Sequence, residues 1–130
     1  MRRRLHQDRF RAAVLDAYAE RCAICRLRRL PLLDAAHIVP DREKLGEAKV
    51  PNGLALCKLH HAAFDANLIG VTPDMEVRIS RDLLDERDGP MLEHGLRGFH
   101  GSRLHAPAAA VDHPDRVLLA LRFERFTRAA

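Results

Sequence analysis

The sequence lacks any apolar stretch that could span a membrane. None of its hydrophobic runs approaches the ~20 apolar residues that a membrane-spanning helix needs. The basic start, MRRRLHQDRFR, is not followed by an apolar run, so it lacks the form of a secretory signal. Internal repeats and low-complexity linkers are also missing. We therefore expect a cytoplasmic protein with no membrane association and, at 130 residues, a single domain over 1–130.

Cysteine is scarce, and the three cysteines form an odd number. Two of them form Cys22-x-x-Cys25, a spacing that in a reducing compartment indicates metal or redox chemistry rather than a structural disulfide. The βαβ pattern of a thioredoxin-like redox site does not surround this pair. The run from Cys57 to His61 lacks the second cysteine of a c-type haem site. Metal binding is the remaining interpretation.

Acidic residues are fewer than basic ones, with 18 Asp and Glu against 22 Lys and Arg, which gives a net charge of +4. A hydrophobic fraction of 47% and a charged fraction of 31% are typical of a globular domain rather than a disordered tail. A basic domain is compatible with a polyanionic partner, because neutralising phosphates releases counterions. Many basic proteins bind no nucleic acid, so motifs have to decide the partner.

The hydrophobic pattern switches between helical and strand-like periods along the chain. The centre reads as strand, loop, strand and helix, with a helix at each end of the chain. We expect helices over residues 5–21, 57–67 and 114–128, strands over 33–39 and 54–56, and a hairpin around 72–74.

Two close pairs of metal-ligating residues lie 31 residues apart, Cys22 with Cys25 and Cys57 with His60. Structural zinc sites commonly take four N or S ligands as two such pairs from two turns. The alternative is that Cys57 is an ordinary buried cysteine and that the other two are incidental. The use of all three cysteines, with a histidine at the matching offset, favours a structural Zn²⁺ that holds the first helix to the central one.

A second metal site is suggested by His61 and Asp65. Neighbouring residues on a helix point about 100° apart, so His61 faces away from the zinc ligand His60. Asp65 lies four residues on and shares the face of His61. One imidazole and one carboxylate suit a divalent ion that keeps open positions for water and phosphate. The alternative is an ordinary polar pair on a solvated helix face.

Two flanking motifs support the second site: "DAAHIVP", which contains His37, and "PNGLALC", which contains Asn52. With these in place, the sequence resembles the HNH endonuclease family, closely over about residues 22–70, and in particular the subgroup found in restriction endonucleases. The resemblance implies an α+β fold with a ββα-metal core (His-Me finger). A structural zinc would staple this core, and N- and C-terminal helices and a β-hairpin would flank it.

The resemblance also implies roles for the catalytic residues His37, Asn52 and His61. His37 matches the general base, which suits a neutral imidazole near physiological pH. Asn52 matches the residue that braces the loop and holds this histidine. His61 matches the metal-ligating histidine, and Asp65 stands where some relatives carry a second helical ligand. The ion would be Mg²⁺ or another divalent metal such as Mn²⁺, and the products would carry a 5′-phosphate and a 3′-hydroxyl.

Ala36 departs from the family pattern, because many members carry Asp or His immediately before the base as a metal ligand. Asp65, Asp34 or water could complete the shell, or the metal binds weakly, or the domain is inactive. We favour Asp65, because Asp34 lies a further ~6–7 Å along the strand from the missing ligand.

Basic side chains are plausible phosphate contacts. The candidates are Arg2, Arg3, Arg4, Arg11, Lys44 and Lys58. No segment resembles a base-reading helix, so we expect sequence specificity to come from a dimer or from a fused specificity domain. The chain would then be the catalytic module of a longer protein.

The function that we predict is metal-dependent hydrolysis of DNA phosphodiester bonds in restriction or defence. A catalytically inactive, zinc-stapled DNA-binding module is the alternative from another class. A toxin nuclease with the same chemistry is a further alternative.

Overall fold

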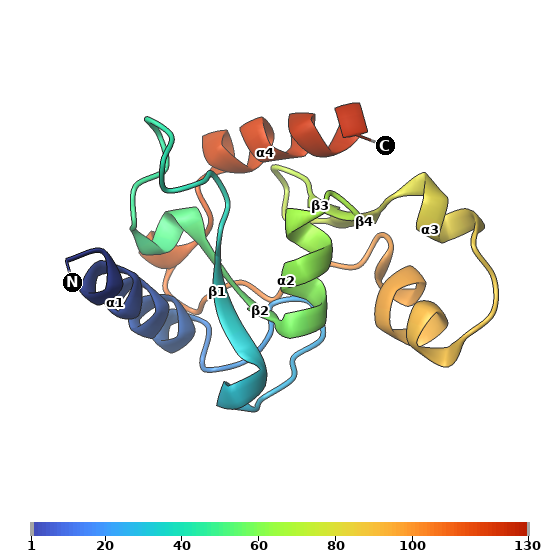
Figure 1. Cartoon of the computed structure of the whole chain (residues 1–130), viewed down its shortest axis with the longest axis horizontal. Helices are drawn as coiled ribbons and strands as arrows, with labels where there is room; N and C mark the ends of the chain where they lie inside the picture. Colours follow the sequence, from blue (N-terminus) through green and yellow to red (C-terminus); the bar gives the residue numbers. More distant parts are fainter. Residues whose placement is uncertain (1, 130) are drawn as a thin grey trace.

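The computed structural model describes residues 2–129, with side chains from residue 4 onward. Its centre is an antiparallel pair of strands, β1 (Leu33–His37) and β2 (Gly53–Cys57), followed directly by α2 (Lys58–Asp65). The strands pair from Leu33 opposite Cys57 to His37 opposite Gly53. The predicted order of strand, long connection, strand and helix is confirmed, and so is the α+β fold class (Figure 1).

The remaining helices and strands surround this centre. They are α1 (Arg2–Ala17), β3 (Ile69–Val71), β4 (Val77–Ile79), α3 (Arg81–Asp85) and α4 (Arg116–Ala129). α1 lies beside β1 and β2 on the side away from α2, and β3 pairs with β4 in the predicted hairpin (Figure 1). α4 packs on β3. A Cβ added at Gly70 would lie 2.5 Å from Cγ of Phe126, so the absence of a side chain allows this close approach.

The helix ends differ from the expected ones for local reasons. α1 ends at Ala17 rather than at residue 21, because Ala19 and Glu20 adopt left-handed backbone conformations with φ of 57° and 54°. α4 begins after Asp115, whose Oδ1 accepts hydrogen bonds from the backbone N–H groups of Val117 and Leu118 at 2.8 and 3.2 Å. Within residues 2–129, no helix is both long and apolar enough to cross a membrane.

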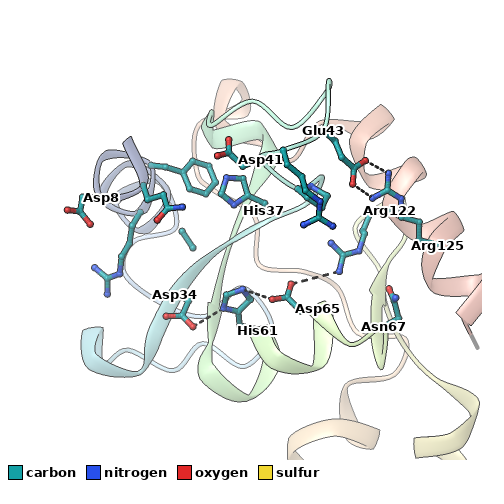
Figure 2. Close-up of a pocket in the computed structure, with 16 residues that line it drawn as sticks. Asp8, Asp34, His37, Asp41, Glu43, His61, Asp65, Asn67, Arg122 and Arg125 are labelled. Carbon is teal, nitrogen blue, oxygen red and sulfur yellow. Dashed lines mark hydrogen bonds and ion pairs between the residues drawn. The ribbon is translucent and has the colours of Figure 1, made fainter. Parts of the chain in front are cut away.

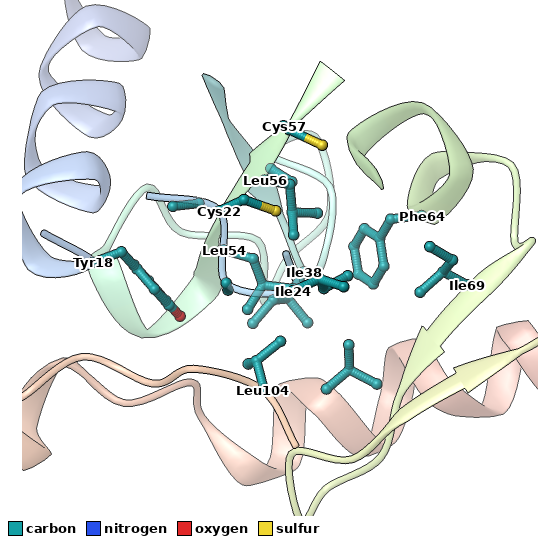
Figure 3. Close-up of a cluster of buried hydrophobic side chains, with 14 of the residues drawn as sticks. Tyr18, Cys22, Ile24, Ile38, Leu54, Leu56, Cys57, Phe64, Ile69 and Leu104 are labelled. Atoms are coloured by element: carbon teal, nitrogen blue, oxygen red, sulfur yellow. The ribbon is translucent and has the colours of Figure 1, made fainter. Parts of the chain in front are cut away.

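The buried core lies between the central strands, α2 and the hairpin (Figure 3). Its fully buried side chains include Ile38, Leu54 and Phe64. Leu59 on α2 is 38% exposed, whereas its neighbour His60 is only 2% exposed. α2 is therefore turned so that His60, a predicted zinc ligand, and not the leucine, faces the interior.

Candidate functional site

The four predicted zinc ligands come together at the junction of β2 and α2. The ligand atoms of Cys22, Cys25, Cys57 and His60 all lie within 4.8 Å of one another. His60 Nδ1 is 3.5 Å from Cys22 Sγ and 3.3 Å from Cys57 Sγ, and the Sγ atoms of Cys25 and Cys57 are 4.0 Å apart. Ligand atoms around a tetrahedral zinc are about 3.5–3.8 Å apart. The cluster therefore has the chemistry and the spacing to hold a structural zinc.

The orientation of His60 fixes which ring nitrogen faces the sulfur atoms. Its Nε2 lies 2.6 Å from the backbone oxygen of Gly95, so the ring donates its N–H there and presents Nδ1 to the cysteines. Hydrogen bonds of this kind orient the histidine ligands of metal sites. Gly95 belongs to a π-helical turn, Met91–Leu96, that lies outside every helix and strand expected from the sequence. No spacing rule connects it to a residue 35 positions earlier.

Asn52 ties together the two ends of the connection between β1 and β2. Its Oδ1 accepts a hydrogen bond from the backbone N–H of Val39 at 2.9 Å. Its Nδ2 donates to the backbone oxygens of Val39 and Glu47 at 2.9 and 3.0 Å. Asn52 is 2% exposed, so its amide group, which makes all three hydrogen bonds, is shielded from water. The side chain thereby holds the backbone two residues after His37.

His37 lies at the end of β1 and packs against α1. Its ring stacks on that of Phe10, with 4.2 Å between centroids and 17° between the planes. Its Nε2 is buried and has no hydrogen-bond partner among the described residues. Burial lowers the pKa of His37 below its usual value of 6.5, against an opposing effect of Asp41. The ring is therefore kept neutral near pH 7, with a lone pair available to accept a proton.

His61 lies between two carboxylates (Figure 2). Its Nδ1 is 2.8 Å from Oδ2 of Asp34, and its Nε2 is 3.2 Å from Oδ2 of Asp65. The other oxygen of Asp34 is 2.5 Å from Nζ of Lys58. Burial raises the pKa of Asp34, but hydrogen bonds from His61 and Lys58 outweigh this effect and lower it below its usual value. The structure thus brings Asp34 and Asp65 to opposite edges of one imidazole.

These side chains line one groove of about 790 Å³. It runs between α1, the first strand, α2 and α4 (Figure 2). Its lining includes His37, His61, Asp65, Arg122 and Arg125. Asn52 is not part of this lining, because it lies beneath it in the buried connection.

The predicted phosphate contacts have different surroundings. Arg11 lines the groove but donates to the backbone oxygens of Leu30 and Leu33 at 3.3 and 3.2 Å. Lys58 is paired with Asp34, Arg4 is exposed on α1, and exposed Lys44 lines a smaller hollow of about 410 Å³. The predictions for Arg2 and Arg3 fall on side chains outside the described ones.

Sequence reasoning missed the contribution of α4 to the groove. Arg122 donates to the backbone oxygens of Ile38 and Phe64 at 3.0 and 2.8 Å, and its Nη2 is 3.9 Å from Oδ1 of Asp65. Arg125 forms a two-pronged ion pair with Glu43. Both arginines lie in a helix whose pattern indicated only packing, so no local signal in the sequence pointed to this role.

Comparison with known proteins agrees with the geometry. Residues 22–72 match the family model of the HNH endonucleases, which confirms the predicted resemblance over the segment that carries both candidate metal sites. The solved structure of the modification-dependent restriction endonuclease TagI has a similar fold, with a TM-score of 0.61 at 18% sequence identity. The match covers 90% of this chain and 37% of that one, so the chain spans little more than a third of that protein. No curated protein matches the chain.

Proposed function

We propose that this chain is a metal-dependent DNA endonuclease module of the HNH type that acts in restriction or defence. The match of residues 22–72 to the HNH endonucleases supports a nuclease. The fold that the chain shares with a restriction endonuclease supports a role in restriction or defence. The observation that carries the proposal is one groove lined by two histidines: half-buried His37, whose pKa burial lowers, and His61, which is held against carboxylates.

His61 and Asp65 would hold the divalent ion. Two ligands at right angles, each about 2.1 Å from a Mg²⁺ ion, are about 3.0 Å apart. The separation of 3.2 Å between His61 Nε2 and Asp65 Oδ2 fits this spacing. When bound, a divalent ion polarises the scissile phosphate and stabilises the leaving oxygen.

His37 is the residue that we assign to proton transfer. Its Nε2 is buried, so Nδ1 takes the proton from the water that attacks phosphorus. Stacking on Phe10 restricts the ring to one orientation. Asn52 contributes indirectly, because it holds the backbone at Val39 through hydrogen bonds.

The rival interpretation, an inactive DNA-binding module, rests on Ala36. Its side chain is a buried methyl group without a donor atom, so position 36 supplies no metal ligand. Asp65, beside His61, supplies a carboxylate in its place. An acidic ligand for a divalent ion is therefore present in the groove, which favours the enzyme.

Plasmid nicking tests the proposal. Supercoiled plasmid is incubated with the zinc-loaded chain and Mg²⁺ or Mn²⁺, beside His37→Ala and His61→Ala. His105→Ala is the matched control, since His105 is exposed and lies outside the groove. We expect nicking by the wild type and the control only. Equal nicking by wild type and His37→Ala would remove His37 from the mechanism, and no nicking by any protein would favour the binding module.

A further inference from the structure

In its neutral form, the form that can ligate a metal ion, His61 faces a hydrogen-bonding conflict. Its Nδ1 and Nε2 approach Asp34 and Asp65 at 2.8 and 3.2 Å, and both partner atoms are carboxylate oxygens. A neutral imidazole carries one N–H, so it donates to one carboxylate only. The other nitrogen then presents a lone pair toward the second carboxylate. A cation between that nitrogen and that carboxylate removes the repulsion.

The surroundings of the two carboxylates show on which side the cation belongs. Asp34 is 24% exposed at its side chain, and its second oxygen is 2.5 Å from the ammonium group of Lys58. A divalent ion at Asp34 would be repelled by this neighbouring positive charge. Asp65 is 59% exposed at its side chain, and its nearest cation, Arg122, is 3.9 Å away. Nε2 of His61 and Asp65 would therefore hold the ion, with the N–H of the imidazole on Nδ1.

We infer that Asp34 is a positioning residue, which accepts the Nδ1–H of His61 and so turns the Nε2 lone pair toward the divalent ion. This inference rests on the proposed metal-dependent function. Lys58 is then the partner that holds Asp34 in place, rather than a free phosphate contact. Carboxylates behind a ligating histidine fix its tautomer and its ring orientation, and their removal typically weakens metal binding 10- to 100-fold.

Metal binding without DNA tests the inference. Free Mn²⁺ is measured by electron paramagnetic resonance during titration of the zinc-loaded full chain. We expect Asp34→Ala to weaken Mn²⁺ binding roughly 10- to 100-fold. Asp34→Asn should lose less, because its amide oxygen still accepts the Nδ1–H without supplying charge. Asp8→Asn is the matched control, since Asp8 lines the same groove without an ion pair to His61 among the described residues, and should stay within twofold of wild type.

The tautomer provides a readout that a merely structural role would not move. In imidazole ¹⁵N spectra with saturating Mg²⁺, wild-type His61 should carry its proton on Nδ1. A proton on Nε2 overturns the inference. So does Mn²⁺ binding within twofold of wild type in an Asp34→Ala variant that retains its zinc. His61→Ala distinguishes failure of the proposed metal site from failure of the role of Asp34. If His61→Ala keeps its Mn²⁺ affinity, the proposed metal site is wrong. If His61→Ala loses affinity and the Asp34 variants do not, only the role of Asp34 is refuted.

Discussion

Replacement of Asn52 by alanine should cost stability before it affects any chemistry. The asparagine is 2% exposed and makes three hydrogen bonds with the backbone, two of them with Val39 and one with Glu47. Alanine would leave the N–H and the C=O of Val39 without partners, at a residue that is 1% exposed. The loosened segment begins two residues after His37, so the base would also lose its fixed position.

The magnitude follows from these contacts. A buried backbone group that loses its partner costs roughly 1–3 kcal/mol, so the two groups of Val39 set a range of roughly 2–6 kcal/mol. Glu47 is exposed, and its carbonyl can turn to water. A water molecule that enters the space vacated by the amide would recover part of the loss. We therefore expect Asn52→Ala to lower the free energy of unfolding by about 3 kcal/mol.

Urea denaturation of the zinc-saturated protein measures this loss. With a slope of roughly 1–3 kcal/mol per molar urea, the midpoint should fall by about 1–3 M. Asn67→Gly is the control: Oδ1 of Asn67 has no hydrogen-bond partner among the described residues, and a φ of 59° suits glycine. A loss below 1 kcal/mol in Asn52→Ala would refute the bracing role, as would an equal loss in both variants.

Two further outcomes follow from the metal cluster and from the base. Cys57→Ala, like a strong chelator, should release one zinc per chain and lower the melting temperature, because zinc binding contributes folding free energy; a variant that keeps its zinc in mass spectrometry and its melting temperature in circular dichroism would contradict this assignment. Since burial lowers the pKa of His37, the acid limb of kcat/KM for nicking should be centred below pH 6.5, as the imidazole gains a proton. An acid limb centred above pH 6.5 in the pH–rate profile would be inconsistent with His37 as the base.

The zinc cluster was predictable because its ligands are close in the chain or at matching offsets. The helical period then separated His60 from His61 without any knowledge of packing. The carbonyl of Gly95, in contrast, reaches His60 from 35 residues away, through a turn that has no recognisable pattern. Long-range placement of this kind depends on the tertiary fold, which local periodicity does not encode.

Asp34 shows how a correct local rule led to an incomplete expectation. Side chains alternate along a strand, so residues 34 and 36 share one face of β1. The distance of Asp34 from position 36 along β1 then argued against a role beside the metal. The distance that matters is to α2, which approaches the strand at Asp34, so that His61 reaches this carboxylate at 2.8 Å. Strand geometry alone could not show where the helix crosses.

Cys57 connects the two candidate metal sites through the start of α2. It is the last residue of β2, a member of the zinc cluster, and the N-cap whose sulfur accepts the backbone N–H of His60 at 3.5 Å. Each residue inserted between His60 and His61 would rotate the rest of the helix by about 100° relative to the cluster. His61 and Asp65 would then turn away from the groove while the zinc remained bound. The predicted zinc ligands thus set the rotation of α2 about its own axis. The connection before Asn52 can therefore change in length, whereas the segment from Cys57 to Asp65 cannot.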